Sequence, residues 1–329
     1  MAWPKGFSRL PVEAWVSQPI GELARKYDTV ENHGWYQNLD PTVEDIVAVL
    51  KDGEVLLDYS GGTGILADRL LARWGDAPRR VLIVDSSPKF LRVAVEKFGE
   101  EPRVGFRRIH YLKEEKRLQT LDECLDASVR DVGVDVLCST NAIHLYYNLE
   151  ETLSSWKRAM RPGGKLFIQS GNIDNPERGE GEWIIDNTVH AIHAKALEMV
   201  RAGAYPDYRE STEDPVRMAE YAKLRAKYFL PVRPLEHYLG ALSRAGFGEV
   251  EHRRTRIEAT VDDWYDFLSA YHAGVIGWVG GVAKIDGADA TAEQVADRLA
   301  LLREAIEQVF DGEQDFACCW TYISATRTG

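Results

Sequence analysis

Two aspartates lie on either side of a glycine-rich turn, and all three features suit the binding of a nucleotide. Asp58 comes just before the turn at residues 60–64, and Asp85 follows it along the chain. Gly62 and Gly64 let the backbone approach a ligand closely, and the helix expected after them presents unpaired N–H groups. A carboxylate at Asp85 can accept hydrogen bonds from both hydroxyls of a ribose. The spacing therefore predicts a site for a ribose-containing cofactor.

The same turn also satisfies the fingerprint of dinucleotide-binding enzymes. Gly62, Gly64 and Ala67 have the spacing G-x-G-x-x-A, which occurs in nicotinamide and flavin enzymes. Asp58 argues against those cofactors, because its carboxylate would repel a pyrophosphate. A carboxylate at this place suits the cationic amino end of a methionine. The turn thus favours S-adenosylmethionine, and an NAD-dependent oxidoreductase is the less favoured alternative.

Short apolar strands alternate with amphipathic helices around these residues. The strands are expected at residues 54–59, 80–85, 104–110, 134–139 and 165–170. This alternation predicts right-handed βαβ units. The fold class is therefore α/β, a Rossmann-like, doubly wound and mostly parallel sheet, with a late antiparallel strand and helical cap insertions.

Interruptions of the alternation divide the chain into segments. We expect an N-terminal helical lid at 1–50, an S-adenosylmethionine-binding core at 51–172, a helical cap insertion at 173–233, more core at 234–260, a second helical insertion at 261–312 and a closing core strand at 313–329. A long helix is expected at 182–201. Both insertions are rich in aromatic residues, and such a cap suits an apolar acceptor, or a cationic one through cation–π contact.

Several segments, in this order, resemble the motifs of class I S-adenosylmethionine-dependent methyltransferases of the small-molecule type. They are residues 58–64 (DYSGGTG), 84–91 (VDSSPKFL), 134–144 (VDVLCSTNAIH) and 161–168 (RPGGKLFI). The resemblance covers residues 50–172 and returns over 234–325. It implies methyl transfer from S-adenosylmethionine to a small molecule.

The resemblance also implies a set of cofactor-binding residues. Asp58, Gly62 and Gly64 would surround the methionine moiety, Asp85 would bind the ribose, and Asn141 would lie beside the donor group. The set is completed by Ser60, Ser86 and His110. Ser60 stands where the family usually has its first glycine. His110 is a candidate adenine contact because the family's usual acid after the third strand is missing here.

Histidine and tyrosine residues after the fourth strand are the candidates for the acceptor side. Alignment of the nucleophile with the activated methyl group does most of the catalytic work, and a general base is needed only if the acceptor must lose a proton. His144 is the best-placed base or substrate contact, and Tyr146 follows it. We therefore predict both as catalytic residues. His190 and His193 share a helical face, but no third ligand accompanies them, so no metal is expected.

Composition narrows the partners. The 329 residues carry a formal net charge of −12, which disfavours nucleic acid because phosphates attract basic surfaces. Residues 273–283, the longest weakly polar run, are too few to span a bilayer, and the N-terminal region lacks the apolar core of a signal peptide. We expect a cytoplasmic enzyme with a small-molecule substrate and no membrane partner. The sequence allows a homodimer as well as a monomer. A different S-adenosylmethionine chemistry, intramolecular displacement or aminoalkyl transfer that releases methylthioadenosine, is the main alternative.

Overall fold

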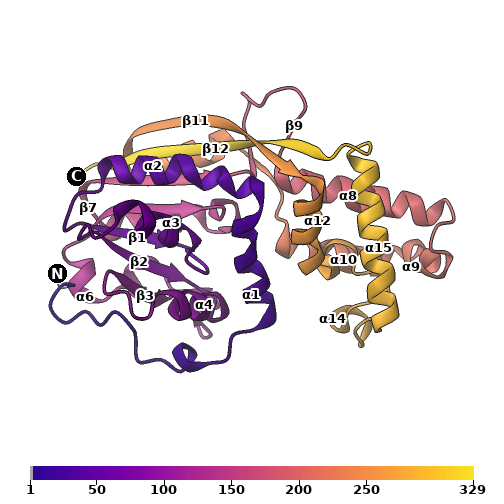
Figure 1. Cartoon of the computed structure of the whole chain (residues 1–329), viewed down its shortest axis with the longest axis horizontal. Helices are drawn as coiled ribbons and strands as arrows, with labels where there is room; N and C mark the ends of the chain where they lie inside the picture. Colours follow the sequence, from indigo (N-terminus) through magenta and orange to yellow (C-terminus); the bar gives the residue numbers. More distant parts are fainter. Residues whose placement is uncertain (1–2) are drawn as a thin grey trace.

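A mostly parallel sheet lies at the centre of the computed structural model, which describes residues 3–329 (Figure 1). Its strand order is β11-β12-β7-β6-β1-β2-β3, and the short strand β9 pairs with β12. The parallel strands are β1 (Val55–Tyr59), β2 (Arg80–Asp85), β3 (Val104–Arg108), β6 (Val134–Thr140) and β7 (Met160–Ser170). Two long antiparallel strands, β11 (Phe247–Thr260) and β12 (Asp315–Arg327), complete one edge. The predicted fold class is confirmed.

The strand order reverses at β1, which pairs with β2 on one side and with β6 on the other. Leu57 is in register with Leu82 of β2 and with Leu137 of β6. All five residues of β1 are buried, because helices cover both faces of the sheet. In open α/β sheets, ligands bind at the carboxyl ends of strands where the order reverses. The site is therefore expected where β1 and β6 end.

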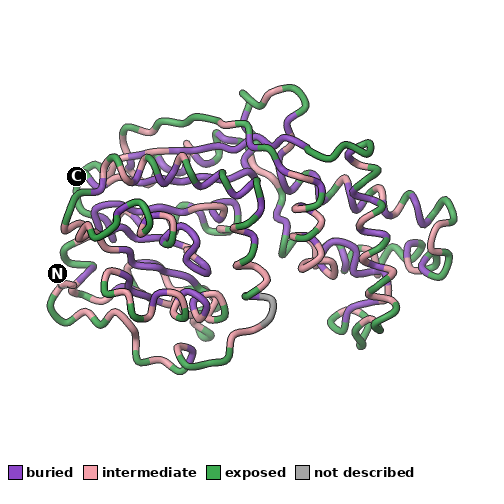
Figure 2. Tube along the Cα trace, in the orientation of Figure 1, coloured by how far each residue is buried: buried purple, intermediate pink, exposed green. Residues whose placement is uncertain are grey.

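Helices on the two faces form separate hydrophobic clusters with the sheet. One face carries α2 (Asp40–Val49), α3 (Ile65–Trp74) and α4 (Pro88–Phe98), and the other carries α5 (Leu121–Cys124), α6 (Ala127–Arg130), α7 (Leu149–Ala159) and α11 (Leu235–Arg244). The start of α4 is set by Ser87, whose hydroxyl accepts the N–H of Phe90, and by Pro88 in the first turn. Figure 2 shows that the sheet strands are largely buried, except the edge strand β11, which is mostly exposed or half-buried.

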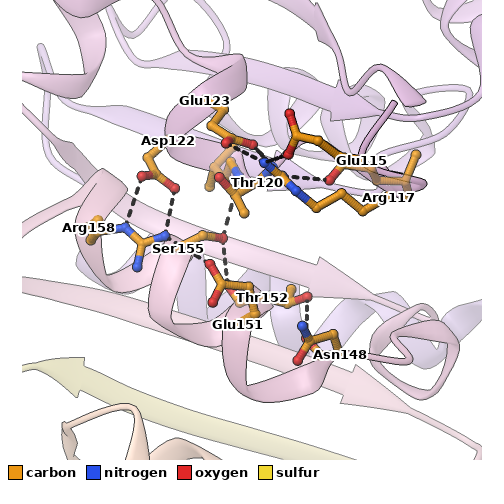
Figure 3. A network of polar contacts seen from close by, with 12 residues as sticks. Glu115, Arg117, Thr120, Asp122, Glu123, Asn148, Glu151, Thr152, Ser155 and Arg158 are labelled. Atoms are coloured by element: carbon orange, nitrogen blue, oxygen red, sulfur yellow. Dashed lines mark hydrogen bonds and ion pairs between the residues drawn. The ribbon is translucent and has the colours of Figure 1, made fainter. Parts of the chain in front are cut away.

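A polar network joins α5 to α7 on the outside of the core (Figure 3). Arg158 of α7 forms a two-pronged ion pair with Asp122 of α5, at 2.9 and 3.0 Å. Glu123 closes a capping box with Thr120 and also pairs with Arg117. Exposed pairs of this kind each contribute ~0.2–1 kcal/mol. The network fixes two short elements, and none of these residues lines a cavity of the site described below.

Helices of the two predicted insertions pack together in one lobe beside the sheet (Figure 1). They are α8 (Ile185–Arg201), η5 (Pro206–Tyr208), α9 (Arg209–Glu213), α10 (Pro215–Tyr228), α12 (Val261–Ala270), α13 (His272–Ile276), α14 (Ala283–Asp286) and α15 (Ala292–Val309). The first insertion leaves and rejoins the core where β8 (Ile173–Asp174) pairs with β10 (Arg233–Pro234), and the second connects β11 to β12. Buried Arg298 of α15 donates to the carbonyl oxygens of Val279 and Gly281, both at 2.8 Å.

The N-terminal segment crosses from the sheet to the lobe. It contains η1 (Ala14–Ser17), α1 (Glu22–Asp28), η2 (Thr29–Asn32) and η3 (Gly34–Leu39), and α1 lies on the side of the core that faces the lobe (Figure 1). Residues 1 and 2 of the predicted lid segment lie outside the described residues.

Some predicted elements differ in their bounds. The expected helix at 182–201 begins instead as strand β9 (Glu182–Trp183), and α8 starts only at Ile185. The buried carboxylate of Glu182 bonds to Arg254 of β11 at 3.0 Å, and this contact draws the segment onto the sheet edge. The expected strand at 104–110 ends at Arg108, and a small hairpin of β4 (Tyr111–Leu112) and β5 (Arg117–Leu118) follows it.

Candidate functional site

The glycine-rich turn connects β1 to α3 and has a left-handed backbone at several positions. The φ angles of Ser60, Gly62 and Gly64 are 63°, 56° and 82°. Ser60 thus adopts the conformation that glycine would adopt more easily, and its side chain is used in a hydrogen bond. Gly61 is required for a different reason, because a Cβ there would lie 2.6 Å from Oδ2 of Asp58. The sequence prediction emphasised Gly62 and Gly64 and missed this close approach.

Asp58 lies beneath the turn and is almost completely buried, with 1% of its surface exposed. The thiol of Cys138 on β6 lies 3.6 Å from Oδ1, and Oδ2 has no hydrogen-bond partner in the described chain. Burial, together with a smaller contribution from the nearby Asp85, raises the pKa of Asp58 to about 7. An unpaired, buried carboxyl group of this kind is costly unless a cation or donor approaches it, so it marks a functional position.

Asp85 at the end of β2 holds the turn in place through its carboxylate. Oδ2 accepts the backbone N–H of Gly62 at 3.0 Å, and Oδ1 accepts that of Ser87 at 2.7 Å. Burial raises the pKa of Asp85 to about 6, and these N–H donors oppose the rise. The cap of α4 is Ser87 rather than Asp85. Ser86, between them, is exposed.

A narrow cleft of about 30 Å³ lies above the turn. The residues around it come from the N-terminal segment, the turn, the start of α3 and the end of β6: Tyr27, Tyr36, Leu39, Ser60, Gly61, Gly62, Thr63, Ile65, Leu66 and Thr140. We refer to this space as the donor cleft, because its lining includes two of the predicted cofactor-binding residues, Ser60 and Gly62. Its floor is the turn that Asp58 and Asp85 support.

A larger cavity of about 170 Å³ lies between the carboxyl ends of the strands and the helical lobe. Most of its wall is aromatic: Tyr27, Trp35, Tyr36, Tyr228, Phe229, Trp264, Phe267, Tyr271 and Trp320. Its polar residues are Asn141, His144, Ser170, Asn172 and Asp186. We refer to this space as the aromatic cavity. The lobe and the N-terminal segment both contribute to it, so sheet, lobe and N-terminal segment meet there.

Tyr27 and Tyr36 line both the donor cleft and the aromatic cavity. Their hydroxyl oxygens lie 3.5 Å apart. The neighbouring Tyr36 and burial raise the pKa of Tyr27, and burial raises that of Tyr36. Both phenols are therefore uncharged at neutral pH, and they form the common wall of the two spaces.

Asn141 lies where β6 ends and has a left-handed backbone, with φ of 54°. Its backbone N–H donates to the carbonyl oxygen of Gln169 at 3.0 Å, and its side-chain amide lies 3.4 Å from Oδ1 of Asn38 in η3. Asn141 lines the aromatic cavity and the preceding residue, Thr140, lines the donor cleft. The structure thus brings Asn141 to the junction of the two spaces.

His144 lines the aromatic cavity, and both of its ring nitrogens are hydrogen-bonded. Nδ1 lies 3.0 Å from the hydroxyl of Ser170, and Nε2 lies 3.1 Å from the side-chain amide nitrogen of Asn172. Because an amide NH₂ only donates, Nε2 accepts and Nδ1–H donates to Ser170. Burial lowers the pKa of His144 to about 3, with a smaller contribution from Arg233. Its imidazole is uncharged and firmly oriented.

Tyr146 is held between the ends of β1 and β6. Its hydroxyl lies 2.8 Å from the Ser60 hydroxyl and 2.9 Å from that of Ser139, and its ring packs edge-on against Tyr59 and Trp156. Tyr146 is absent from the described lining of both the donor cleft and the aromatic cavity.

His110, the candidate adenine contact, is half-buried and is absent from the described lining of the donor cleft. Its Nε2 atom is 3.0 Å from a carboxylate oxygen of Glu13 in the N-terminal segment. The side-chain nitrogen of Trp15 donates to the same oxygen at 2.8 Å. The N-terminal segment thus supplies an acid beside the end of β3, a position that the sequence prediction did not identify.

Asp186, in the first turn of α8, is a site residue that sequence reasoning missed. It lines the aromatic cavity, is 5% exposed, and has one carboxylate oxygen, Oδ2, without a hydrogen-bond partner in the described chain. Its backbone N–H donates to Oδ1 of Asn172 at 2.8 Å. Burial raises the pKa of Asp186 to about 7, and a hydrogen bond with Asn172 opposes the rise. The sequence offered one signal, an acid at a helix start, and that signal is common.

Comparison with known proteins identifies the core. Residues 57–166 match the family described as "Methyltransferase domain". The chain resembles the structure of a Haemonchus contortus phosphoethanolamine N-methyltransferase 2 in complex with S-adenosyl-L-methionine, with a TM-score of 0.50, 16% identity, and coverage of 93% of this chain and 57% of that one. Residues 57–166 therefore carry the methyltransferase domain that the sequence motifs predicted, and the solved structure shares the fold of the chain.

Curated relatives match parts of much longer proteins. The hybrid PKS-NRPS synthetase apdA of Emericella nidulans is 29% identical over 114 residues, which are 34% of this chain and 3% of that protein. Clavatol synthase claF of Penicillium crustosum is 24% identical over 259 residues, which are 72% of this chain and 9% of that protein. The chain thus spans less than a tenth of the length of these two relatives.

Residues 3–329 show neither a membrane-spanning helix nor a cluster of metal ligands. No helix in this range has both the length and the apolar character needed to cross a membrane. The same range holds no group of three or more His, Cys, Asp or Glu side chains arranged for a metal ion.

Proposed function

We propose that the chain transfers a methyl group from S-adenosylmethionine to a small molecule held in the aromatic cavity. One observation carries this proposal: Tyr27 and Tyr36 line both the donor cleft and the aromatic cavity, so the two spaces adjoin. When bound, S-adenosylmethionine supplies an electrophilic methyl group on a sulfonium and leaves as S-adenosylhomocysteine. The chain's own contribution is to align the acceptor and exclude water.

Residues of the turn fit this donor. The unpaired Oδ2 of Asp58 suits the cationic amino group of the methionine moiety, directly or through water. Ser60, Gly61 and Gly62 line the cleft in which the donor would lie. We assign Asp85 and the neighbouring Ser86 to the ribose, Asn141 to the side of the donor group, and His110 to the adenine end with Glu13.

Two roles are assigned to the predicted catalytic residues. His144 touches the acceptor space with an uncharged ring that Ser170 and Asn172 hold in one orientation. This arrangement supports a role in shaping the cavity and contacting the acceptor. Tyr146 acts through Ser60 rather than by touching a ligand, because its hydroxyl is hydrogen-bonded to Ser60 at the edge of the donor cleft. We therefore propose Tyr146 as a positioning residue.

The test begins with native mass spectrometry of the chain with S-adenosylmethionine, S-adenosylhomocysteine and NAD. We expect stoichiometric retention of the sulfur nucleotides and no retention of NAD. Acceptors are then screened by release of S-adenosylhomocysteine. Release of methylthioadenosine would indicate intramolecular displacement or aminoalkyl transfer instead, and retention of NAD would contradict the role given to Asp58.

The remaining expectations concern the setting of the enzyme. A small-molecule acceptor, rather than nucleic acid, agrees with the enclosed aromatic cavity and with the net charge of −12. The cytoplasmic location and the homodimer stay predictions. Sedimentation of the purified chain at two concentrations tests the homodimer.

A further inference from the structure

The charge distribution of the aromatic cavity is one-sided. Asp186 is the one acidic residue among the described residues that line it, and that lining includes no lysine or arginine. Asp186 takes part in no ion pair within residues 3–329. A buried carboxylate without a cationic partner is unfavourable on its own. The cavity is therefore electrostatically incomplete without a ligand.

Titratable groups near Asp186 do not compensate it. Tyr238 of α11 is buried, and Asp186 acts to raise its pKa. Arg233 acts to lower the pKa values of Tyr238 and His144, but it does not pair with Asp186. His144 itself is uncharged, and its neighbour Asn172 donates to it. Within the described residues, no Lys, Arg or His side chain thus forms an ion pair with Asp186.

The rest of the cavity wall suits a cation. Trp264 and Phe267 stack with ring centroids 5.2 Å apart, and Tyr271 lies 5.1 Å from Phe267. Tyr228 extends the row, 6.1 Å from Tyr271. Aromatic faces attract ammonium groups by cation–π interaction, most strongly when water is excluded.

We propose that the acceptor is a primary or secondary amine, and that Asp186 binds its ammonium group and takes up one proton from it. This inference rests on the proposed methyl transfer. An N–H bond of the ammonium breaks, an O–H bond forms on the carboxylate of Asp186, and the electron pair stays on nitrogen. That lone pair is the nucleophile for the methyl carbon, whose bond to sulfur breaks as its electrons return to sulfur.

An amine explains the arrangement better than a phenol or an alcohol does. A neutral hydroxyl brings no positive charge to the cavity, so the buried carboxyl would still lack its counter-charge. A carboxylic acid acceptor would add a second negative charge near Asp186 and is disfavoured by repulsion. The aromatic wall gives a further advantage to a cation over an uncharged molecule of the same shape.

The test uses phenyl-containing probes of similar size that differ in charge and reacting group. They are phenethylamine, 4-ethylphenol and 3-phenylpropanoate, each measured by calorimetric binding to the full chain with S-adenosylhomocysteine present. We expect the wild-type chain to bind the amine at least tenfold more tightly than the phenol. Asp186→Asn should lose most of that preference while it binds S-adenosylhomocysteine as the wild type does.

Asp262→Asn is the matched control, because Asp262 is also an acid in the first turn of a lobe helix but is exposed. It should keep the wild-type preference. A wild-type chain that does not prefer the amine, or an Asp186→Asn variant that still does, would overturn the inference. Loss of S-adenosylhomocysteine binding by the wild type would instead overturn the proposed function.

A second measurement on the wild type does not depend on the variant folding. Amine binding at pH 6 is measured in two buffers that differ in ionisation enthalpy. Binding of the ammonium should release a proton from Asp186, whereas no proton should be released on binding of 4-ethylphenol. Equal heats for the amine in both buffers would contradict a direct contact between the ammonium and Asp186.

Discussion

Tyr27 and Tyr36 bring their hydroxyl oxygens to 3.5 Å from one another at the boundary between the donor cleft and the aromatic cavity. They come from α1 and η3, two elements of the N-terminal segment. A segment that precedes the core in sequence therefore builds the wall that both ligands would share. In physical terms, the N-terminal segment can couple the binding of donor and acceptor, because displacement of either tyrosine changes both spaces.

Replacement of Tyr36 tests this shared wall. Tyr36→Ala should weaken both donor binding and acceptor binding by roughly tenfold, about 1.4 kcal/mol each, since its ring borders both spaces. Tyr271→Ala is the matched control, because Tyr271 lines only the aromatic cavity. It should weaken acceptor binding alone. Calorimetry with S-adenosylhomocysteine measures donor affinity, and calorimetry with an acceptor measures acceptor affinity. Equal donor affinity in the wild type and both variants would refute the shared wall.

Asp85→Asn should weaken donor binding by about tenfold, because an amide can supply only one acceptor oxygen in place of two. The carboxylate already accepts the N–H groups of Gly62 and Ser87, so part of the loss would come through the turn. The dissociation constant of S-adenosylhomocysteine is the measurement. A folded variant with the wild-type constant would show that Asp85 does not act at the donor site.

The donor half of the site could be predicted from sequence because its residues are close together along the chain. An apolar strand, a glycine turn and an acid at the next strand end are local patterns, and their geometry is fixed by the βαβ connection. Asp58, Gly62, Gly64 and Asp85 were predicted in this way. Gly61 was missed, since its requirement comes from contact with Asp58 and not from its own φ angle.

The acceptor half depends on contacts between distant segments. Trp35, Trp264 and Trp320 lie in one aromatic cluster although they come from η3, α12 and β12. Aromatic residues of the insertions could not be sorted in advance into core and cavity: Trp278 is fully buried in the lobe, whereas Trp264 also lines the cavity. Asp186 was overlooked because acids in a first helical turn are usually explained by the helix dipole.

Asp58→Asn should change stability in a pH-dependent way. Burial raises the pKa of Asp58 to about 7, above its unfolded value, so the folded state holds the proton more tightly. The stability that this proton provides is complete below the unfolded pKa and is lost as pH rises through about 7. Relative to the wild type, the variant should therefore gain stability between pH 5 and pH 8, on the order of 2–3 kcal/mol.

Thermal unfolding of both proteins at the two pH values measures this gain. Asp85 and Asp186 are present in both proteins, so the difference isolates Asp58. A variant advantage that is equal at pH 5 and pH 8 would show that the Asp58 carboxyl is not protonated in the folded chain near neutrality. Donor binding should be weaker in the variant at both pH values.

His144→Ala should lower turnover more than donor affinity, because His144 lines the aromatic cavity but not the donor cleft. The pKa of about 3 has a further consequence. The folded pKa of His144 lies below its ordinary value, so its ring stays neutral from pH 5 upwards. The pH profile of kcat in that range should therefore keep its shape in the His144→Asn variant. If a rise or fall of kcat with pH disappeared in this variant, His144 itself would titrate during turnover.

Gly61→Ala should impair the donor site directly. A Cβ at this position would lie 2.6 Å from Oδ2 and 2.8 Å from Cγ of Asp58, so either the turn or the carboxyl group must move. We expect a loss of stability of about 1–3 kcal/mol from overpacking, together with at least tenfold weaker donor binding. Gly34→Ala is the control, because the nearest atom to its Cβ would be 3.9 Å away. It should leave both properties unchanged. If Gly61→Ala bound S-adenosylhomocysteine as the wild type does, Asp58 and the turn would not form the methionine end of the site.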